Sequence, residues 1–393
     1  MATTEPQLWE ALRGVLDPEL HMSIVELDMV KDLSVFDGGR RVSVTVALTV
    51  AGCPMRTEIT ERVRSALWPL DGVEDVDVQL TVMTEPELAA VRDKMRARQG
   101  SGVPGNGVPG NGAGAGAGQP LGHERGVPNP FMSPESRTRI LGINSGKGGV
   151  GKSSVSVNLA VALARAGHSV GILDADVYGF SVPKMLGIES DPVVIDDMIV
   201  PPVGYGVSCI SIGFFVGDDQ PVMWRGPMLH KALEQFLVDV YWGDPEFLVV
   251  DMPPGTGDVA LSMAQYLPRS EMYVVTTPQA AAQRVAQRTA LMAKTVNMPL
   301  RGVIENMSWF TGDDGRRYEL FGHGGGQTLA DSLGVPLLAQ LPLVPALREG
   351  GDLGRPVTAT DPTGEAAVAF DALAQAIVAR GATRVFRPEL TIR

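Results

Sequence analysis

The chain has 393 residues, and its 33 basic and 45 acidic side chains give a formal net charge of −12. This acidic balance disfavours broad binding to nucleic acids or anionic membranes, and the hydrophobic content of 44% indicates a globular protein. The two cysteines suit a reducing compartment, and no signal-peptide pattern or run of about 18 apolar residues occurs, so we expect a cytoplasmic protein with no membrane and no nucleic-acid partner.

Glycine and proline divide the sequence into three parts. The pentapeptide Gly-Val-Pro-Gly-Asn occurs twice, at 102–106 and 107–111, and alternating glycine and alanine follow it. Such a segment has too few apolar side chains to offset the entropy lost on folding, so it predicts a flexible tether. We therefore expect a small domain over residues 1–98, a flexible Gly/Pro-rich linker over 99–133 and a large domain over 134–393.

The small domain is predicted to be an α+β unit. Apolar residues alternate along 41–50, which is typical of a half-buried strand. The other expected strands cover 29–36 and 76–82, and the expected helices cover 7–16, 55–67 and 85–98.

The large domain alternates short apolar runs with stretches of helical periodicity. Near-continuous apolar strands separated by helices are typical of a parallel sheet covered on both faces, so we predict an α/β fold with a mostly parallel sheet. Ligands of such sheets bind beyond the carboxyl ends of the strands. The expected strands cover 139–144, 169–173, 247–251, 272–277, 300–305 and 337–341, and the expected helices cover 153–166, 227–241, 280–296 and 364–380.

A glycine-rich loop follows the first of these strands and matches the pattern G-x-x-x-x-G-K-[ST]. Its glycines let backbone N–H groups turn toward phosphate oxygens, and the N-terminus of the next helix adds the positive end of its dipole. Lys152 is expected to reach the β- and γ-phosphates, and the hydroxyl of Ser153 is expected to bind Mg²⁺. The expected nucleotide contacts of this phosphate loop are Gly146, Lys147, Gly148, Gly149, Val150, Gly151, Lys152, Ser153 and Ser154.

Three carboxylates follow predicted strands at the edge where the loop lies. Asp174 and Asp176 come at the end of the second strand, and Asp251 ends the run Phe-Leu-Val-Val-Asp. A hydrophobic strand that ends in an acid is typical of a Walker B element, whose acid holds Mg²⁺ directly or through water. Asp174 or Asp176 could instead cap the short helix that follows, and this alternative stays open.

The loop resembles the deviant Walker A motif of the MinD/ParA-like P-loop ATPases, in which a second lysine stands where this sequence has Lys147. The resemblance implies that Lys147 reaches the phosphates of the partner subunit, so that ATP lies between two protomers of a homodimer joined through their nucleotide faces. It also implies that Asp174 lies near the magnesium ion and that Asp176 positions the attacking water. Lys147, Lys152 and Asp176 would then be the catalytic residues, and Asn306, after a predicted strand, would contact the adenine.

Further stretches resemble the Mrp/ApbC branch of these ATPases, the iron–sulfur cluster carriers. The small domain resembles the domain often fused ahead of Mrp proteins and found alone in cluster-assembly factors. The resemblance implies an ATP-hydrolysing homodimer that binds iron–sulfur clusters and transfers them to target apoproteins, with apo iron–sulfur proteins or assembly factors as partners. The stretches that carry it are 223–228, 305–308, 321–326 and 341–352 in the large domain, and Asp17-Pro18-Glu19, Val25-Glu26-Leu27 and Cys53-Pro54 in the small one.

The cysteines depart from the Mrp pattern. Many Mrp proteins have a Cys-x-x-Cys between the second and third of the large-domain stretches, and the interval 309–320 contains no cysteine here. A [4Fe–4S] cluster needs about four thiolates. We expect Cys209, in an apolar run, to be buried, and Cys53 is the candidate iron–sulfur ligand, with a buried structural thiol as its alternative. The alternative functions are an ATP-switched scaffold or positioning ATPase, and a cluster-independent protein adaptor.

Overall fold

The computed structural model describes residues 3–49, 55–98, 129–133, 135–177, 179–195, 198–215, 226–255 and 258–382. The chain forms two compact units. One comprises Met1–Val127 together with Pro192–Pro201 and Asp239–Gly243, and the other comprises the remainder. Most of the predicted linker, 99–128, lies outside the described residues, so the domain boundaries at 98 and 133 stay predictions.

The N-terminal unit contains a three-stranded sheet in which β1 (Val30–Phe36) pairs antiparallel with β2 (Arg41–Leu48), and β2 pairs parallel with β3 (Asp75–Val82). Alternate side chains of β2 enter the core, as its sequence pattern predicts: Val42, Val44 and Val46 are fully buried. The structure confirms the α+β prediction. The other elements of this unit are α1 (Glu5–Arg13), η1 (Asp37–Gly39), α2 (Arg56–Leu67) and α3 (Glu85–Arg98).

Two helices, α1 and α6 (Gly226–Val238), differ from their predicted bounds by more than one residue. Helix α1 begins two residues earlier than predicted, because Thr4 and Gln7 form a capping box, and it ends at Arg13. Helix α6 ends three residues before the predicted end at 241. The backbone beyond it bonds instead to β7 (Met198–Val200), which pairs with β6 (Val193–Ile195). The N–H of Ile199 donates to the carbonyl of Asp239, and the N–H of Tyr241 donates to the carbonyl of Ile199.

The large unit is built on an eight-stranded sheet in the order β15-β12-β11-β4-β10-β5-β9-β8. All neighbouring strands run parallel except the edge pair β8–β9, so the structure confirms the predicted mostly parallel sheet. Strand β9 was not predicted, because Ser208 and Ser211 interrupt its short apolar run. The strands are β4 (Arg139–Ser145), β5 (Val170–Asp174), β8 (Val203–Gly204), β9 (Val207–Ser211), β10 (Phe247–Asp251), β11 (Glu271–Thr276), β12 (Leu300–Glu305) and β15 (Leu337–Gln340).

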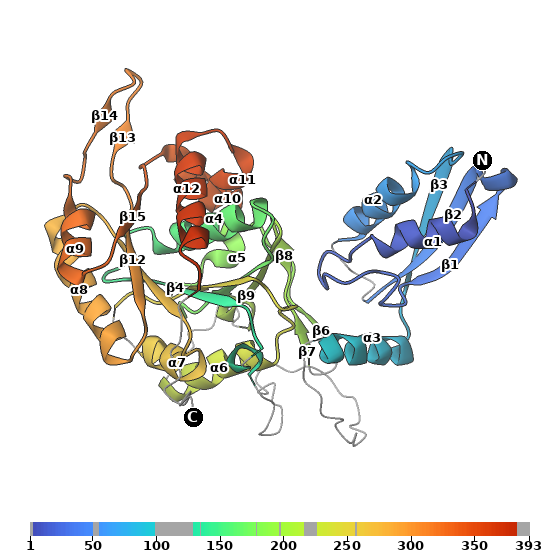
Figure 1. Cartoon of the computed structure of the whole chain (residues 1–393), viewed down its shortest axis with the longest axis horizontal. Helices are drawn as coiled ribbons and strands as arrows, with labels where there is room; N and C mark the ends of the chain where they lie inside the picture. Colours follow the sequence, from blue (N-terminus) through green and yellow to red (C-terminus); the bar gives the residue numbers. More distant parts are fainter. Residues whose placement is uncertain are drawn as a thin grey trace, which may run out of the picture. The chain divides into compact units, whose positions relative to one another are not determined.

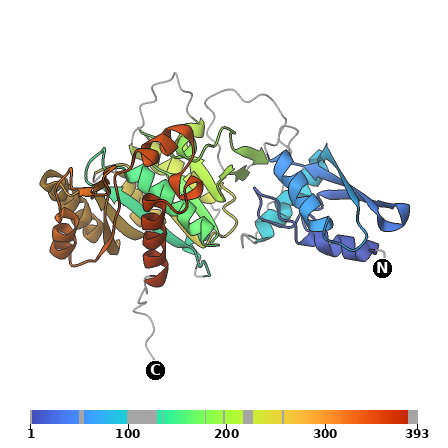
Figure 2. The same cartoon turned by 90° about the horizontal axis from the view of Figure 1, so that it is seen from above.

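Helices cover both faces of this sheet, with α4 and α12 on one face and α6 and α7 on the other (Figure 1). Helix α12 packs beside α4, which is also visible in the perpendicular view (Figure 2). None of the described helices is long and apolar enough to cross a membrane. Besides α6, the unit contains η2 (Pro130–Met132), α4 (Lys152–Arg165), α5 (Val182–Met185), η3 (Ile212–Phe215), α7 (Asp258–Tyr266), α8 (Ala280–Thr295), α9 (Gly325–Leu333), α10 (Pro345–Leu353), α11 (Val357–Thr360), α12 (Glu365–Ala379) and the short strands β13 (Phe310–Thr311) and β14 (Arg317–Tyr318).

Candidate nucleotide-binding site

The phosphate loop joins β4 to α4, and its geometry requires glycine at several positions. Gly149 and Gly151 have φ angles of +81° and +79°, a region that other residues rarely adopt. A Cβ at Gly151 would lie 2.3 Å from Nδ2 of Asn306, and a Cβ at Gly146 would lie 2.3 Å from the backbone nitrogen of Ala286 in α8. The loop therefore runs in close contact with both the end of β12 and helix α8.

The other loop positions separate into exposed and buried ones. Gly148 is exposed, and a Cβ there would meet no atom within 4 Å. Val150 is buried, and Ser154 lies in the first turn of α4, where its carbonyl accepts a hydrogen bond of 2.9 Å from Nδ2 of Asn158. The exposed glycines leave the concave side of the loop open in front of the N-terminus of α4, where an anion is favoured.

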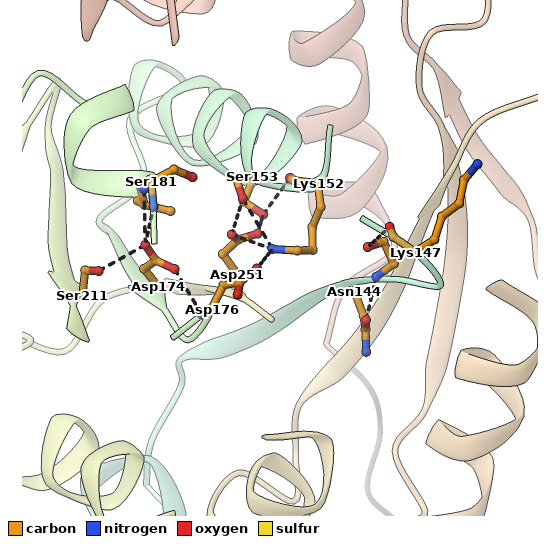
Figure 3. Close-up of polar contacts among 12 residues, drawn as sticks. Asn144, Lys147, Lys152, Ser153, Asp174, Asp176, Ser181, Ser211 and Asp251 are labelled. Carbon is orange, nitrogen blue, oxygen red and sulfur yellow. Dashed lines mark hydrogen bonds and ion pairs between the residues drawn. The ribbon is translucent and has the colours of Figure 1, made fainter. Parts of the chain in front are cut away.

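Lys152 and Ser153 both contact the carboxylate of Asp251 (Figure 3). Nζ of Lys152 lies 2.7 Å from Oδ2 of Asp251, and the Ser153 hydroxyl donates to the same oxygen at 2.6 Å. Ser156, one turn further along α4, donates to the other oxygen at 2.6 Å. Asp251 is fully buried, so these three donors are what makes a charged carboxylate tolerable at this place.

The register of the sheet explains why the acids meet at this site. Strands β10 and β5 pair so that Asp251 lies opposite Asp174, and both strands end there. Oδ2 of Asp174 accepts hydrogen bonds from the backbone of Ser181 (3.1 Å) and Val182 (3.2 Å), at the start of α5, and from the Ser211 hydroxyl (3.1 Å). Asp174 therefore caps α5, the alternative that the sequence left open.

Asp174 and Asp176 differ in environment and direction. Burial, and next the nearby charge of Asp251, raise the pKa of Asp174 to about 7. Asp176 is less buried, and its Oδ2 lies 3.7 Å from Nζ of Lys152. Of the two, Asp176 is the carboxylate that the structure brings to the loop lysine.

Lys147 points away from this cluster (Figure 3). Its half-buried side chain extends to the opposite side of the loop, where Nζ lies 3.4 Å from Oε1 of Gln279. The Ser145 hydroxyl donates to the Lys147 backbone carbonyl at 3.1 Å, which fixes the chain at the start of the loop. Lys147 thus adds no charge to the group around Lys152 in its own protomer.

Asn306 follows β12 and contacts the phosphate loop directly. Its Nδ2 donates to the carbonyl of Val150 at 2.9 Å, and its Oδ1 is buried without a hydrogen-bond partner among the described residues. The hydroxyl of Thr277 is likewise buried and without a partner in the described part of the chain. The register pairs Thr276 with Glu305, so Thr277 and Asn306 follow directly on adjacent strands. A buried amide oxygen that lacks a donor fits the amino group of an adenine.

Sequence analysis missed three residues of this site. Ser156 could have been found, since it lies one helical turn after Lys152 and so faces the same side of α4. Thr277 and Gln279 had no such signal, because only the strand order, which places β11 beside β4, brings them to the loop.

The cysteines give no metal site in the described structure. Cys53 lies outside the described residues. Cys209 in β9 is fully buried, as predicted, and burial raises the pKa of its thiol. No group of three or more His, Cys, Asp or Glu side chains in the described ranges could hold a metal ion. The oxygens of Ser153 and Asp251 do, however, suit Mg²⁺, which prefers hard oxygen ligands and keeps several waters.

Comparison with known proteins places similarity over both units. The family model described as "NUBPL iron-transfer P-loop NTPase" matches residues 136–378, and one described as "Iron-sulfur cluster assembly protein" matches residues 5–80. The chain is 45% identical over 353 residues to an iron-sulfur cluster carrier protein of Mycobacterium leprae, covering 88% of this chain and 85% of that one. It is 40% identical over 387 residues to a protein of the same name from Synechocystis, covering 97% and 98%.

Among solved structures, a nucleotide-binding protein from Archaeoglobus fulgidus in complex with ADP is 32% identical. The superposition covers 58% of this chain and 90% of the Archaeoglobus chain, with a TM-score of 0.51.

Proposed function

Because this chain belongs to the family of NUBPL iron-transfer P-loop NTPases, we propose that it is a homodimeric ATPase that binds iron–sulfur clusters and transfers them to target apoproteins. Two findings support an iron–sulfur cluster as the cargo: the name shared by its relatives, and the match of its N-terminal region to a cluster-assembly family. One observation supports the ATPase activity most directly: Lys152 and Ser153 both contact Asp251 at the end of a phosphate loop. The partners would be apo iron–sulfur proteins or assembly factors in the cytoplasm.

The loop and its lysine bind and orient the nucleotide. The backbone N–H groups of the glycine-rich turn hold the β-phosphate, and Lys152, on binding, exchanges part of its contact with Asp251 for the phosphate oxygens. Asn306 donates to or accepts from the adenine through the amide whose oxygen has no partner among the described residues. These contacts position the terminal phosphate in front of Asp176.

Ser153 and Asp251 would hold the magnesium ion, Asp251 directly or through water. When bound there, the ion would neutralise charge that develops on the transferred phosphoryl group. Asp176, 3.7 Å from Nζ of Lys152, accepts a hydrogen bond from the attacking water and orients it. Asp174 keeps the loop that carries Asp176 in place, because it binds the start of α5 and the backbone of Asp176.

The direction of Lys147 supports a dimer. A second lysine aimed into the same cluster would repel Lys152, but Lys147 extends away from it (Figure 3). We propose that Lys147 contacts the phosphates of the nucleotide held by the partner protomer. Dimerisation would then depend on bound ATP.

The cluster is cargo in this proposal, and its ligand is Cys53. The only thiol among the described residues, that of Cys209, is fully buried and has a raised pKa, which makes it a poor ligand. Two copies of Cys53 per dimer are fewer than the four thiolates that a [4Fe–4S] cluster uses, so the cluster should be held weakly and released readily.

Anaerobic reconstitution tests this function. The full-length protein would be incubated with ferrous iron and sulfide, then analysed for iron and acid-labile sulfide and mixed with an apo iron–sulfur enzyme whose activity returns on loading. We expect the native chain and a Cys209→Ala control to bind and transfer a cluster, and a Cys53→Ser variant to do neither. A native chain that retains no iron and activates no acceptor would exclude the carrier function.

A cluster-independent adaptor is the second candidate, and the β13–β14 hairpin favours it. Side chains tie this interval, 309–320, to the start of α12: Trp309 and Thr311 each donate to the carboxylate of Glu365 at 2.8 Å, and the Arg317 guanidinium lies 4.2 Å from the centre of the Trp309 ring. Together with the antiparallel pairing of β13 and β14, these contacts hold the described segment in place through protein groups. If the Cys53→Ser variant still supports acceptor maturation in cells, the adaptor is correct and the carrier is not.

A further inference from the structure

Lys147 is held inside its own protomer by a glutamine that no motif includes. Strands β4 and β11 are neighbours, with Ser145 paired to Val275, so the two loops that leave their carboxyl ends run side by side. The first carries Lys147 and the second carries Gln279. The ammonium group of Lys147 lies 3.4 Å from Oε1 of Gln279, and it contacts no carboxylate among the described residues.

The turn that carries Gln279 is fixed at the carbonyl of Pro278. Nε2 of Gln283 donates to the carbonyl of Pro278 at 3.0 Å. Gly325, in the first turn of α9, packs so closely on this pair that an added Cβ would lie 2.2 Å from the same carbonyl and 2.3 Å from Nε2 of Gln283. Gly146 is packed equally tightly on the backbone of α8. Close packing therefore fixes the backbone of both loops, at Gly146 against α8 and at Pro278 against α9.

Among the described residues, the side chain of Gln279 makes no hydrogen bond other than the one from Lys147. Gln279 is the N-cap residue of α8, yet its side chain makes no capping hydrogen bond. Its amide oxygen instead receives the Lys147 ammonium group. A neutral amide gives a contact that is weaker than a salt bridge and so can be broken when a stronger anion arrives.

We propose that Gln279 is a positioning residue that retains the Lys147 side chain in its own protomer and thereby raises the threshold for ATP-dependent dimerisation. This inference rests on the proposed function, in which Lys147 must leave its protomer to contact the nucleotide of the partner. Release of Lys147 then competes with the Gln279 contact, and only bound triphosphate in the partner offers a more favourable site.

The size of the effect follows from the two contacts that each dimer must break. A single hydrogen bond to an ammonium group, at the long distance of 3.4 Å, should bias Lys147 toward the retained position about threefold. Two protomers are involved, so loss of the contact should lower the dimer dissociation constant about tenfold.

The test compares substitutions that remove the acceptor with one that strengthens it. Gln279→Ala and Gln279→Met remove the amide oxygen, and methionine keeps the length of the side chain. Gln279→Glu replaces the amide by a carboxylate. Gln327→Ala is the matched control, since the exposed Gln327 side chain, within the described part of the chain, bonds only to Asp331 on α9. Sedimentation velocity of the full chain with Mg²⁺ and ATPγS gives the dimer dissociation constant, and thermal unfolding checks that each variant folds.

We expect dimers about tenfold tighter for the alanine and methionine variants, weaker and salt-sensitive dimers for the glutamate variant, and no change for Gln327→Ala. Opposite shifts for alanine and glutamate cannot arise from a merely structural role. The proposal is overturned if the alanine and methionine variants dimerise as the native chain does, or if alanine and glutamate shift the constant in the same direction.

A Lys147→Ala background separates this inference from the proposed function. There the Gln279 substitutions should have no effect, and an effect that persists contradicts the role assigned to Gln279. If Lys147→Ala alone dimerises with ATPγS as tightly as the native chain, the role of Lys147 across the interface fails instead.

Discussion

Replacement of Lys152 by methionine should weaken the fold of the large unit as well as abolish nucleotide binding. The Lys152 ammonium is the cation that contacts the fully buried Asp251 carboxylate, at 2.7 Å. Methionine keeps the length of the side chain but leaves a buried carboxylate whose remaining side-chain donors, among the described residues, are the hydroxyls of Ser153 and Ser156. Asp174, paired opposite Asp251, adds repulsion once the lysine is gone.

The expected loss can be estimated from these contacts. Removal of one partner of a buried ion pair costs about 3–5 kcal/mol, and the two hydroxyls that stay on Asp251 place the expected loss at the lower end, about 3 kcal/mol. For a unit of this size that corresponds to a decrease in melting temperature of about 6–12 °C. A second substitution, Asp251→Asn, removes the buried charge, so the double variant should regain most of this loss while still failing to bind nucleotide.

Thermal unfolding in the absence of nucleotide, together with titration of a fluorescent ATP analogue, gives both quantities. Ser156→Ala is a control, since it removes one neutral donor from Asp251 and should cost about 1–2 kcal/mol. The reasoning is wrong if Lys152→Met melts at the native temperature, or if the double variant is no more stable than Lys152→Met alone.

Three further outcomes are expected. Lys147→Ala should keep nucleotide affinity in the monomer, measured by titration, but lose most ATP-dependent dimerisation and turnover. Gly151→Ala should abolish nucleotide binding and cost a few kcal/mol in unfolding experiments, because its φ is +79° and the new Cβ would lie 2.3 Å from Nδ2 of Asn306. Burial, and next the charge of Asp17, raise the pKa of Glu19 to about 7. Glu19 therefore holds its proton more tightly in the folded N-terminal unit than in the unfolded chain. Its contribution to stability is therefore complete below about pH 4.5 and is lost as the pH rises through 7. In the Glu19→Gln variant, the melting temperature of that unit should change less with pH over this interval.

Much of the fold follows from sequence patterns. The predicted strands that form the centre of the large sheet are present, because continuous apolar runs such as Phe247–Asp251 can be buried on both faces only in a covered parallel sheet. The edge of the sheet was harder to predict. Strand β9 contains two serines in five residues, and its burial depends on pairing with β5, which lies about 35 residues away in the sequence and leaves no local pattern.

The sequence predicts most residues of the candidate site, but it does not predict which of them contact one another. Spacing alone locates the phosphate loop and Asp251, since each chemical role requires a residue type at the end of a strand. The capping of α5 by Asp174 and the retention of Lys147 by Gln279 depend on which strands become neighbours. The interval 309–320 shows the same limit: its ordered hairpin depends on Glu365, about 50 residues later.

A crystal structure of the full chain with Mg²⁺ and ATPγS would test most directly whether one nucleotide is bound between two protomers. We expect Lys152 on the phosphates of the nucleotide in its own loop, Ser153 on the ion, and Lys147 of each protomer extended across to the nucleotide of the other. Protomers that bind the analogue without pairing, or a pair in which Lys147 remains against Gln279, would contradict the account.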